Sequence, residues 1–226
     1  MKFIYTLLAT LLICLPIYSL EIHVATMFVG QEYMRITYPC FVNKSNYCRQ
    51  HEYPLHVYTE CLDPSRPISW SKILILLEIM EDPAVQWVFW TDADSLIMNP
   101  TITLDTFIDI NYDMIIGSDC NGLNAGQLFI RNCDWSRKFL QEIYTKTEFL
   151  HHEWWEQMAM MDHLKHSEMD MNHVKILPQR VINSYAREFY YRKLDVYYQQ
   201  GDFMLHFAGL KGQQLEKLII KYSQLQ

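Results

Sequence analysis

The chain has 226 residues, a formal net charge of −7 and 50% hydrophobic side chains, with 7 Gly and 8 Pro. This length suits one compact domain, and the absence of low-complexity runs argues against a disordered chain. The acidic balance, without any Lys/Arg cluster, argues against a nucleic-acid partner. An anionic ligand would therefore need a local positive centre, such as a divalent metal held by carboxylates.

Residues 1–19 carry a separate signal. Lys2 precedes an apolar run from Phe3 to Leu15, and a small residue, Ser19, stands near its end. This pattern predicts a secretory signal peptide. A retained signal-anchor with membrane attachment, or a buried first element, are the alternatives, and the run is short for a membrane span. We expect residues 1–19 to be the leader or anchor and residues 20–226 to be the folded domain.

Cysteine spacing and one sequon bear on the compartment. An odd number of cysteines would remain after cleavage at Ser19, which leaves at least one thiol outside any intramolecular disulfide. Cys40 and Cys48 fall in a stretch that we expect to be helical, where their separation is about 12 Å, too far for a disulfide. Asn43-Lys44-Ser45 matches a glycosylation sequon, a weak indication of a lumenal location.

Hydrophobic periodicity and breakers predict alternating strands and helices. In chain order, we expect a strand at 21–28, a mostly helical stretch to 52, a strand at 55–59, a helix at 70–81, a strand at 85–91, a helix at 104–110, strands at 113–117 and 126–130, helices at 135–149 and 154–165, a strand-like segment at 174–177, a long loop, a strand at 202–206 and an amphipathic helix at 213–224. This order predicts an α/β fold, a Rossmann-like single domain with a mostly parallel central sheet flanked by helices. Ligands of such sheets bind at the carboxyl ends of the strands.

A carboxylate pair follows the expected strand 85–91. Asp92 and Asp94, separated by Ala93, stand on the turn that leaves this strand, so both side chains can face one point at the sheet edge. Mn²⁺ and Mg²⁺ prefer oxygen ligands and keep open positions for phosphate oxygens. The pair therefore predicts a metal that bridges a diphosphate and stabilises it as a leaving group. The alternative is a solvated turn with an Asp at a helix N-cap.

A rival enzyme class uses the same tripeptide. Phosphatases of the haloacid dehalogenase type carry it after a buried strand, and Gly201-Asp202 is similar to their late Gly-Asp pair. In that class the strand usually comes first, whereas two strands precede it here. Leu96 stands where a Thr or Val is expected, and His206 where a second acidic residue is expected. A metal-dependent phosphohydrolase is therefore disfavoured.

The chain resembles one enzyme family over more than the Asp92/Asp94 pair. Residues 90–100 (WTDADSLIMNP) resemble the W-x-D-A-D-x-x-I-M-N-P block of glycosyltransferase family 34. Further blocks resemble that family in the same order: Asn43-Lys44 with Tyr47, His51 and Tyr53; Trp70 with Lys72; 119–131; 201–209; and shorter echoes at Glu156-Gln157, 178–180 and 183–185. This resemblance spans residues 22–212. It implies a GT-A fold and a retaining transfer of galactose, mannose or xylose.

The resemblance also implies roles for individual residues. Asp92, Asp94 and His206 would be metal ligands, and Lys211 would face the donor diphosphate. Glu156 and Gln157 would lie near the reacting carbon and form the catalytic set with Lys211, although the family tends to have Asp where this chain has Glu. The donor would be bound by Asp92, Ala93, Asp94, Asn121, Asn124, Ala125, Gly126, Gly209 and Lys211. An imidazole ligand favours Mn²⁺ over Mg²⁺. The adjacent Trp154 and Trp155 predict either core packing or a surface that stacks on a sugar.

The leading hypothesis is therefore a retaining glycosyltransferase that moves a hexose or pentose from a nucleotide-diphosphate sugar to a glycan acceptor. UDP-galactose and UDP-xylose are favoured as donors over GDP-mannose. The alternative is a non-catalytic domain that binds a nucleotide-sugar or a glycan. This alternative is disfavoured because the chain retains the carboxylate pair, His206 and Lys211. Because transporters supply nucleotide-sugars to exported transferases, we expect the secretory pathway, in the Golgi lumen or membrane.

Overall fold

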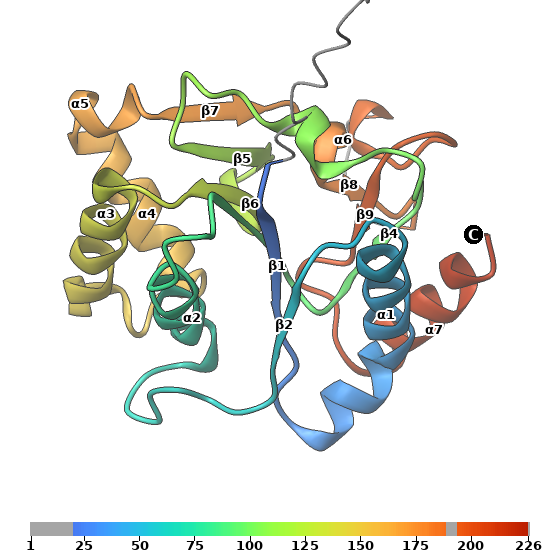
Figure 1. Ribbon diagram of the computed structural model, residues 1–226. Helices are drawn as coiled ribbons and strands as arrows, with labels where there is room; N and C mark the ends of the chain where they lie inside the picture. The colour runs from blue at the N-terminus through green and yellow to red at the C-terminus, as the bar shows by residue number, and fades with distance from the viewer. Residues whose placement is uncertain (1–19, 189–193, 226) are drawn as a thin grey trace, which may run out of the picture.

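The computed structural model describes residues 20–188 and 194–225 (Figure 1). The strands are β1 (Ile22–Met27), β2 (Leu55–Tyr58), β3 (Trp87–Thr91), β4 (Ser95–Ile97), β5 (Met114–Asp119), β6 (Gly122–Arg131), β7 (Val174–Leu177), β8 (Ser184–Tyr185) and β9 (Met204–His206). The helices are α1 (Gln31–Gln50), α2 (Ser71–Ile79), α3 (Asp134–Thr145), α4 (Trp155–His166), α5 (Glu168–Met171), α6 (Gln179–Ile182) and α7 (Gly212–Ser223). Short 3₁₀ turns are η1 (Ile68–Trp70), η2 (Leu104–Phe107), η3 (Thr147–Phe149) and η4 (Leu194–Val196).

The leader expected at residues 1–19 lies outside the described residues. Among the helices that the structure does describe, none combines the length and the apolar character needed to cross a bilayer.

The large sheet has the strand order β2-β1-β3-β6-β5-β7. Strand β6 is antiparallel to both of its neighbours, β3 and β5, and the other pairs are parallel. The expected mostly parallel sheet flanked by helices is thus confirmed. The register sets Thr91, the last residue of β3, opposite Gln127 of β6. The loop that leaves β3 therefore lies beside the first half of β6.

A second, three-stranded sheet with the order β4-β9-β8 was not expected from the sequence. Strand β4 follows the carboxylate pair directly, and its antiparallel register with β9 sets Ser95 opposite His206. Segments of three residues are too short to show a periodic pattern. This sheet matters because it brings His206 to the carboxylate pair from more than one hundred residues along the chain.

Three clusters of buried side chains hold the layers together. One lies between the large sheet and helices α2, α3 and α4, and a second lies on the opposite face, against α1, α6 and β9. The third joins α1 and α7 to the small sheet, and Figure 1 shows these two helices side by side, away from α2, α3 and α4. Consecutive β3 residues enter opposite clusters, Trp90 the first and Phe89 the second. Burial on both faces explains why β3 is apolar throughout.

Several element boundaries differ from expectation. The helix expected at 104–110 is only the 3₁₀ turn η2, since Asp109 accepts hydrogen bonds from the backbone and side chain of Asn111 and turns the chain. The strand expected at 126–130 begins at Gly122, because it forms a tight hairpin with β5. The long loop expected after residue 177 contains α6 and β8.

The sequon has a structural role. The side chain of Asn43 donates to the carbonyl of Ile97 at 2.9 Å and accepts from the Ile97 N–H at 2.8 Å. Its amide is therefore engaged inside the folded domain and gives no support for a lumenal location. Cys40 and Cys48 both lie on α1 and are free thiols, as the helical separation predicts.

Candidate active site

A pocket of about 730 Å³ lies where the loop after β3 meets the first half of β6 and the end of β9. Its volume falls in the range of small-molecule sites. The lining includes most of the expected site residues: Asp92, Ala93, Asp94, Asn121, Asn124, Gly126, Glu156, Gln157, His206, Gly209 and Lys211. Ala125 is the exception, because its side chain belongs to the core on the far side of β6.

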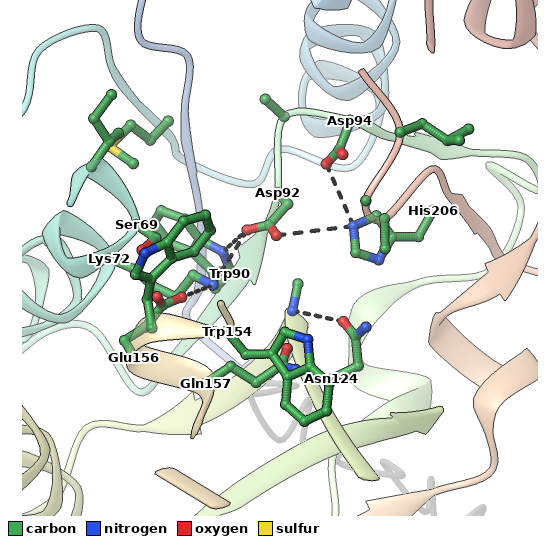
Figure 2. A pocket seen from close by; sticks show the side chains of 18 of the residues that line it. Ser69, Lys72, Trp90, Asp92, Asp94, Asn124, Trp154, Glu156, Gln157 and His206 are labelled. Atoms are coloured by element: carbon green, nitrogen blue, oxygen red, sulfur yellow. Dashed lines mark hydrogen bonds and ion pairs between the residues drawn. The ribbon is translucent and has the colours of Figure 1, made fainter. Parts of the chain in front are cut away.

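The carboxylate pair and His206 converge at one point of this pocket (Figure 2). The Nε2 atom of His206 lies 3.4 Å from Oδ1 of Asp94 and 3.9 Å from Oδ2 of Asp92. One ligand atom from each of the three residues lies within 4.8 Å of the others. Two carboxylates and one imidazole on an open pocket suit a divalent cation that keeps positions for phosphate oxygens.

Asn183 orients the imidazole. Its Oδ1 lies 2.7 Å from Nδ1 of His206, and both residues are buried. An amide oxygen can only accept, so Nδ1 carries the proton and Nε2 presents its lone pair towards the carboxylates. This is the tautomer that a metal at Nε2 requires.

Gly126 makes room for this cluster. A β-carbon at position 126 would lie 2.3 Å from Cε1 of His206 and 3.0 Å from Oδ2 of Asp92. The backbone carbonyl of the same residue accepts from the Asp92 N–H at 2.8 Å. The small residue expected in the donor pocket therefore also lets strand β6 approach the imidazole and the carboxylate closely.

A buried lysine connects the carboxylate pair to Glu156. The Nζ atom of Lys72 lies 2.8 Å from Oε1 of Glu156 and 3.4 Å from Oδ1 of Asp92, and it donates to the Ala125 carbonyl at 2.9 Å. Glu156 is only 3% exposed, so it is not a solvated helix residue. Its Oε2 has no hydrogen-bond partner among the described residues. Such a buried acceptor in a ligand pocket can receive a substrate hydroxyl.

Burial and neighbouring charges shift the pKa values of Lys72, Asp92 and Asp94 in opposite directions. Burial lowers the pKa of Lys72, but the charges of Asp92 and Glu156 outweigh it, so the pKa is raised and the ammonium is kept. Burial raises the pKa of Asp92, and Lys72 and His206 offset this only in part. Burial also acts to raise the pKa of Asp94, but the hydrogen bond and charge that His206 supplies when both of its ring nitrogens carry a proton outweigh burial, so the pKa is lowered. The site therefore keeps carboxylate character at Asp94 despite burial.

Amides and a tyrosine shape the β6 side of the pocket. Asn124 donates to Asp119 at 2.7 Å, and Tyr185 donates to the same carboxylate oxygen at 2.7 Å. The Oε1 atom of Gln157 accepts from the Ala125 N–H at 2.9 Å. These bonds hold Asn124 and Gln157 in place against β6, with the Asn124 side chain facing the pocket beside His206 (Figure 2).

The remaining expected residues lie at the rim. Gly209 adopts a φ of 77°, which glycine tolerates and other residues rarely do, and it turns the chain after β9. The turn leads to Lys211, an exposed residue at the start of α7 that also lines the pocket. Asn121, at the β5–β6 hairpin, is exposed at the opposite rim.

Comparison with known proteins bears on this arrangement. The profile of the galactosyl transferase GMA12/MNN10 family matches residues 24–111 and 109–215. The chain belongs to this family. The resemblance to glycosyltransferase family 34 is thereby confirmed.

Curated relatives agree with the family. A probable alpha-1,2-galactosyltransferase of Schizosaccharomyces pombe is 27% identical over 212 residues, covering 75% of this chain and 62% of that protein. An alpha-1,2-galactosyltransferase of the same organism is 25% identical over 228 residues, covering 81% of this chain and 59% of that protein. Galactomannan galactosyltransferase 1 of Cyamopsis tetragonoloba is 32% identical over 110 residues, covering 44% of this chain and 25% of that protein. The chain thus spans less than two thirds of the length of these relatives.

Solved structures show the same fold. A glycosyltransferase involved in the glycosylation of the major capsid of PBCV-1 superposes with a TM-score of 0.69 at 12% identity, covering 88% of this chain and 99% of that one. The galactosyltransferase LgtC, crystallised with donor and acceptor sugar analogs, gives a TM-score of 0.54 at 11% identity, covering 88% and 95%. The GT-A fold class expected from the sequence is confirmed.

Sequence reasoning missed two contributors to the site. Lys72 was noticed only as part of a block, although a lone cation in a helix expected to be buried is itself a signal of a buried ionic partner. Asn183 was noticed only within the short echo at 183–185, because its role depends on where β9 places His206.

Proposed function

We propose that the chain is a retaining glycosyltransferase that transfers galactose from UDP-galactose to a glycan acceptor. The observation that carries the proposal is the convergence of Asp92, Asp94 and His206 in one pocket with Lys211 at its rim. GT-A glycosyltransferases take nucleotide-sugar donors and often a divalent metal, and the names of the relatives favour galactose over xylose or mannose.

The three ligand atoms would hold Mn²⁺. The ion supplies positive charge to the donor diphosphate when bound. One imidazole beside two carboxylates suits Mn²⁺ better than Mg²⁺. Asn183 accepts from Nδ1 of His206, so in the neutral imidazole the lone pair is on Nε2, the atom that would bind the ion.

Lys211 would neutralise the departing diphosphate. No carboxylate of the described residues lies within ion-pair distance of its ammonium, so the charge is available to an anionic ligand. In the reaction, the bond from the anomeric carbon to the diphosphate breaks, and a bond to an acceptor hydroxyl oxygen forms while its proton passes to the departing diphosphate. Lys211→Ala should lower kcat by about 10²–10³, the usual effect of removing one charge-stabilising donor.

Glu156 would bind rather than react. Its Oε1 is neutralised by Lys72, and its unpartnered Oε2 is free to accept a hydroxyl of the sugar. Gln157, the next residue, would also bind the sugar, on the side of the pocket that β6 forms. The buried Glu156 and the partly exposed Asp92 both contact Lys72 and keep its positive charge close to the donor.

The proposal is tested by incubating the protein with a panel of nucleotide-sugars and Mn²⁺ and measuring released nucleoside diphosphate. UDP-galactose should turn over best, and Asp92→Ala or Asp94→Ala should lower the rate by orders of magnitude while circular dichroism stays unchanged. Full turnover in excess EDTA would refute the metal site. Binding of UDP-galactose without any turnover would instead indicate a non-catalytic domain.

We further propose export through residues 1–19 to the Golgi, as a soluble or anchored form. Nucleotide-sugars are made in the cytosol, so an exported transferase needs a compartment with transporters. N-terminal sequencing of the mature protein distinguishes the two forms, since an intact Met1 indicates a retained anchor.

A further inference from the structure

Two adjacent tryptophans stand at the mouth of the pocket. Trp154 and Trp155 both line it, together with Ile68 from the turn before α2. Neither indole belongs to the buried clusters, nor to the partly buried side chains packed against them. Trp155 is 39% exposed and Ile68 is 47% exposed. Core packing therefore does not explain this pair, and an apolar surface at a pocket mouth is typical of a binding site.

The backbone at Trp155 is a second observation. Its φ is 39°, in the left-handed region that bulky residues rarely adopt because the β-carbon approaches the carbonyl oxygen. Trp155 directly precedes Glu156, which is buried against Lys72. A strained backbone held by its surroundings beside a ligand pocket indicates a side chain whose position matters for binding.

Polar groups line the same pocket as the two indoles. Glu153 and Ser69 line the same pocket, and Figure 2 shows the ring of Trp154 near Gln157 and Asn124. A purely apolar occupant would remove these groups from water without offering hydrogen bonds. The carboxylate of Glu153 disfavours an anionic occupant. The surroundings therefore suit a neutral ligand with both an apolar face and hydroxyl donors.

We infer that Trp154 and Trp155 form the platform on which the acceptor lies, and that the acceptor is a neutral pyranose with an unsubstituted C–H face. This inference rests on the proposed transferase function. The C–H groups of a pyranose pack against the negative face of an aromatic ring, while its hydroxyls reach Glu153. The platform is continuous with the pocket that contains Asp92 and Lys211, so a sugar on it can present a hydroxyl to the anomeric carbon of the donor.

The test uses the full chain with Mn²⁺, UDP-galactose and the methyl glycosides of mannose, galactose and glucose as acceptors. Trp155→Ala and Trp154→Ala should each raise the acceptor KM about tenfold, whereas the KM for UDP-galactose should change less than about threefold. Trp155→Phe should recover most of the loss because it keeps an aromatic face. Met169→Ala, at an exposed apolar side chain outside the pocket, should leave both constants unchanged.

Trp155→Gly separates binding from folding. Glycine accepts the positive φ without strain, so the thermal midpoint should not fall although the indole is lost. An unchanged acceptor KM in the two alanine variants, or transfer to none of the glycosides by a wild-type protein that still hydrolyses UDP-galactose, would overturn the inference. A wild-type protein that neither binds nor hydrolyses UDP-galactose would refute the proposed function instead.

Discussion

Replacing Gly126 with alanine tests the geometry of the metal site most directly. The new β-carbon would lie 2.3 Å from Cε1 of His206, where ordinary contact begins at 3.4 Å. The imidazole or strand β6 must therefore move by about 1 Å, and shifts of this size in a reacting geometry can lower a rate about 10²-fold. The strand conformation itself tolerates alanine, because Gly126 has no positive φ. We expect Mn²⁺ affinity to fall about 10- to 100-fold, as when the support of a metal ligand is lost.

The assay measures Mn²⁺ binding in the presence of UDP. The electron paramagnetic resonance signal reports the concentration of Mn²⁺ that stays free. Circular dichroism checks that the variant is folded. The control is a double-mutant cycle, in which Gly126→Ala is also made in a His206→Ala background. In the background without the imidazole, the added methyl group should lower affinity less than it does in the wild-type protein, because the contact of 2.3 Å with Cε1 of His206 is gone and only those of 2.9 Å with Asn124 and 3.0 Å with Asp92 remain. Wild-type Mn²⁺ affinity in Gly126→Ala would refute the placement of His206 at the metal.

Two further predictions concern contacts of the site, and a third concerns Asp170 of α5, which does not line the pocket. Asn183→Ala should weaken Mn²⁺ binding about 10-fold, measured by the same resonance assay, because Nδ1 of His206 loses the acceptor that fixes its tautomer; unchanged affinity would mean that the amide is not needed. Lys72→Met should lower the free energy of unfolding by about 3 kcal/mol in urea titrations, since it leaves Glu156 buried without a partner, and adding Glu156→Gln should recover part of the loss. Burial acts to raise the pKa of Asp170, but hydrogen bonds from Ser167 and its neighbours outweigh it and lower the pKa to about 2. The lowered pKa contributes about 2 kcal/mol to the free energy of unfolding above pH 4, and this contribution is lost as the pH falls through 2. In acid unfolding, the wild-type protein should therefore lose this contribution, whereas Asp170→Asn should not.

The site itself could be predicted only in part. The carboxylate pair was found because a buried strand and the turn after it are adjacent in sequence, and local hydrophobic pattern reports both. His206 and Lys211 came from the resemblance to a family rather than from any local rule. The contact between Lys72 and Glu156 joins residues 84 positions apart, and no periodicity encodes such a pair.

The sequence by itself determined the α/β class, the order of most elements and the buried strand that directly precedes Asp92 and Asp94. Those features depend on apolar periodicity and on breakers such as Pro83, which act within a few residues. Only the tertiary structure decided which distant side chains meet the pair. The register of β4 with β9 brings His206 to Asp94, and the antiparallel insertion of β6 beside β3 brings Gly126 to Asp92. Register follows from the packing of whole sheets between helices, so it is a property of the folded chain that no short segment carries.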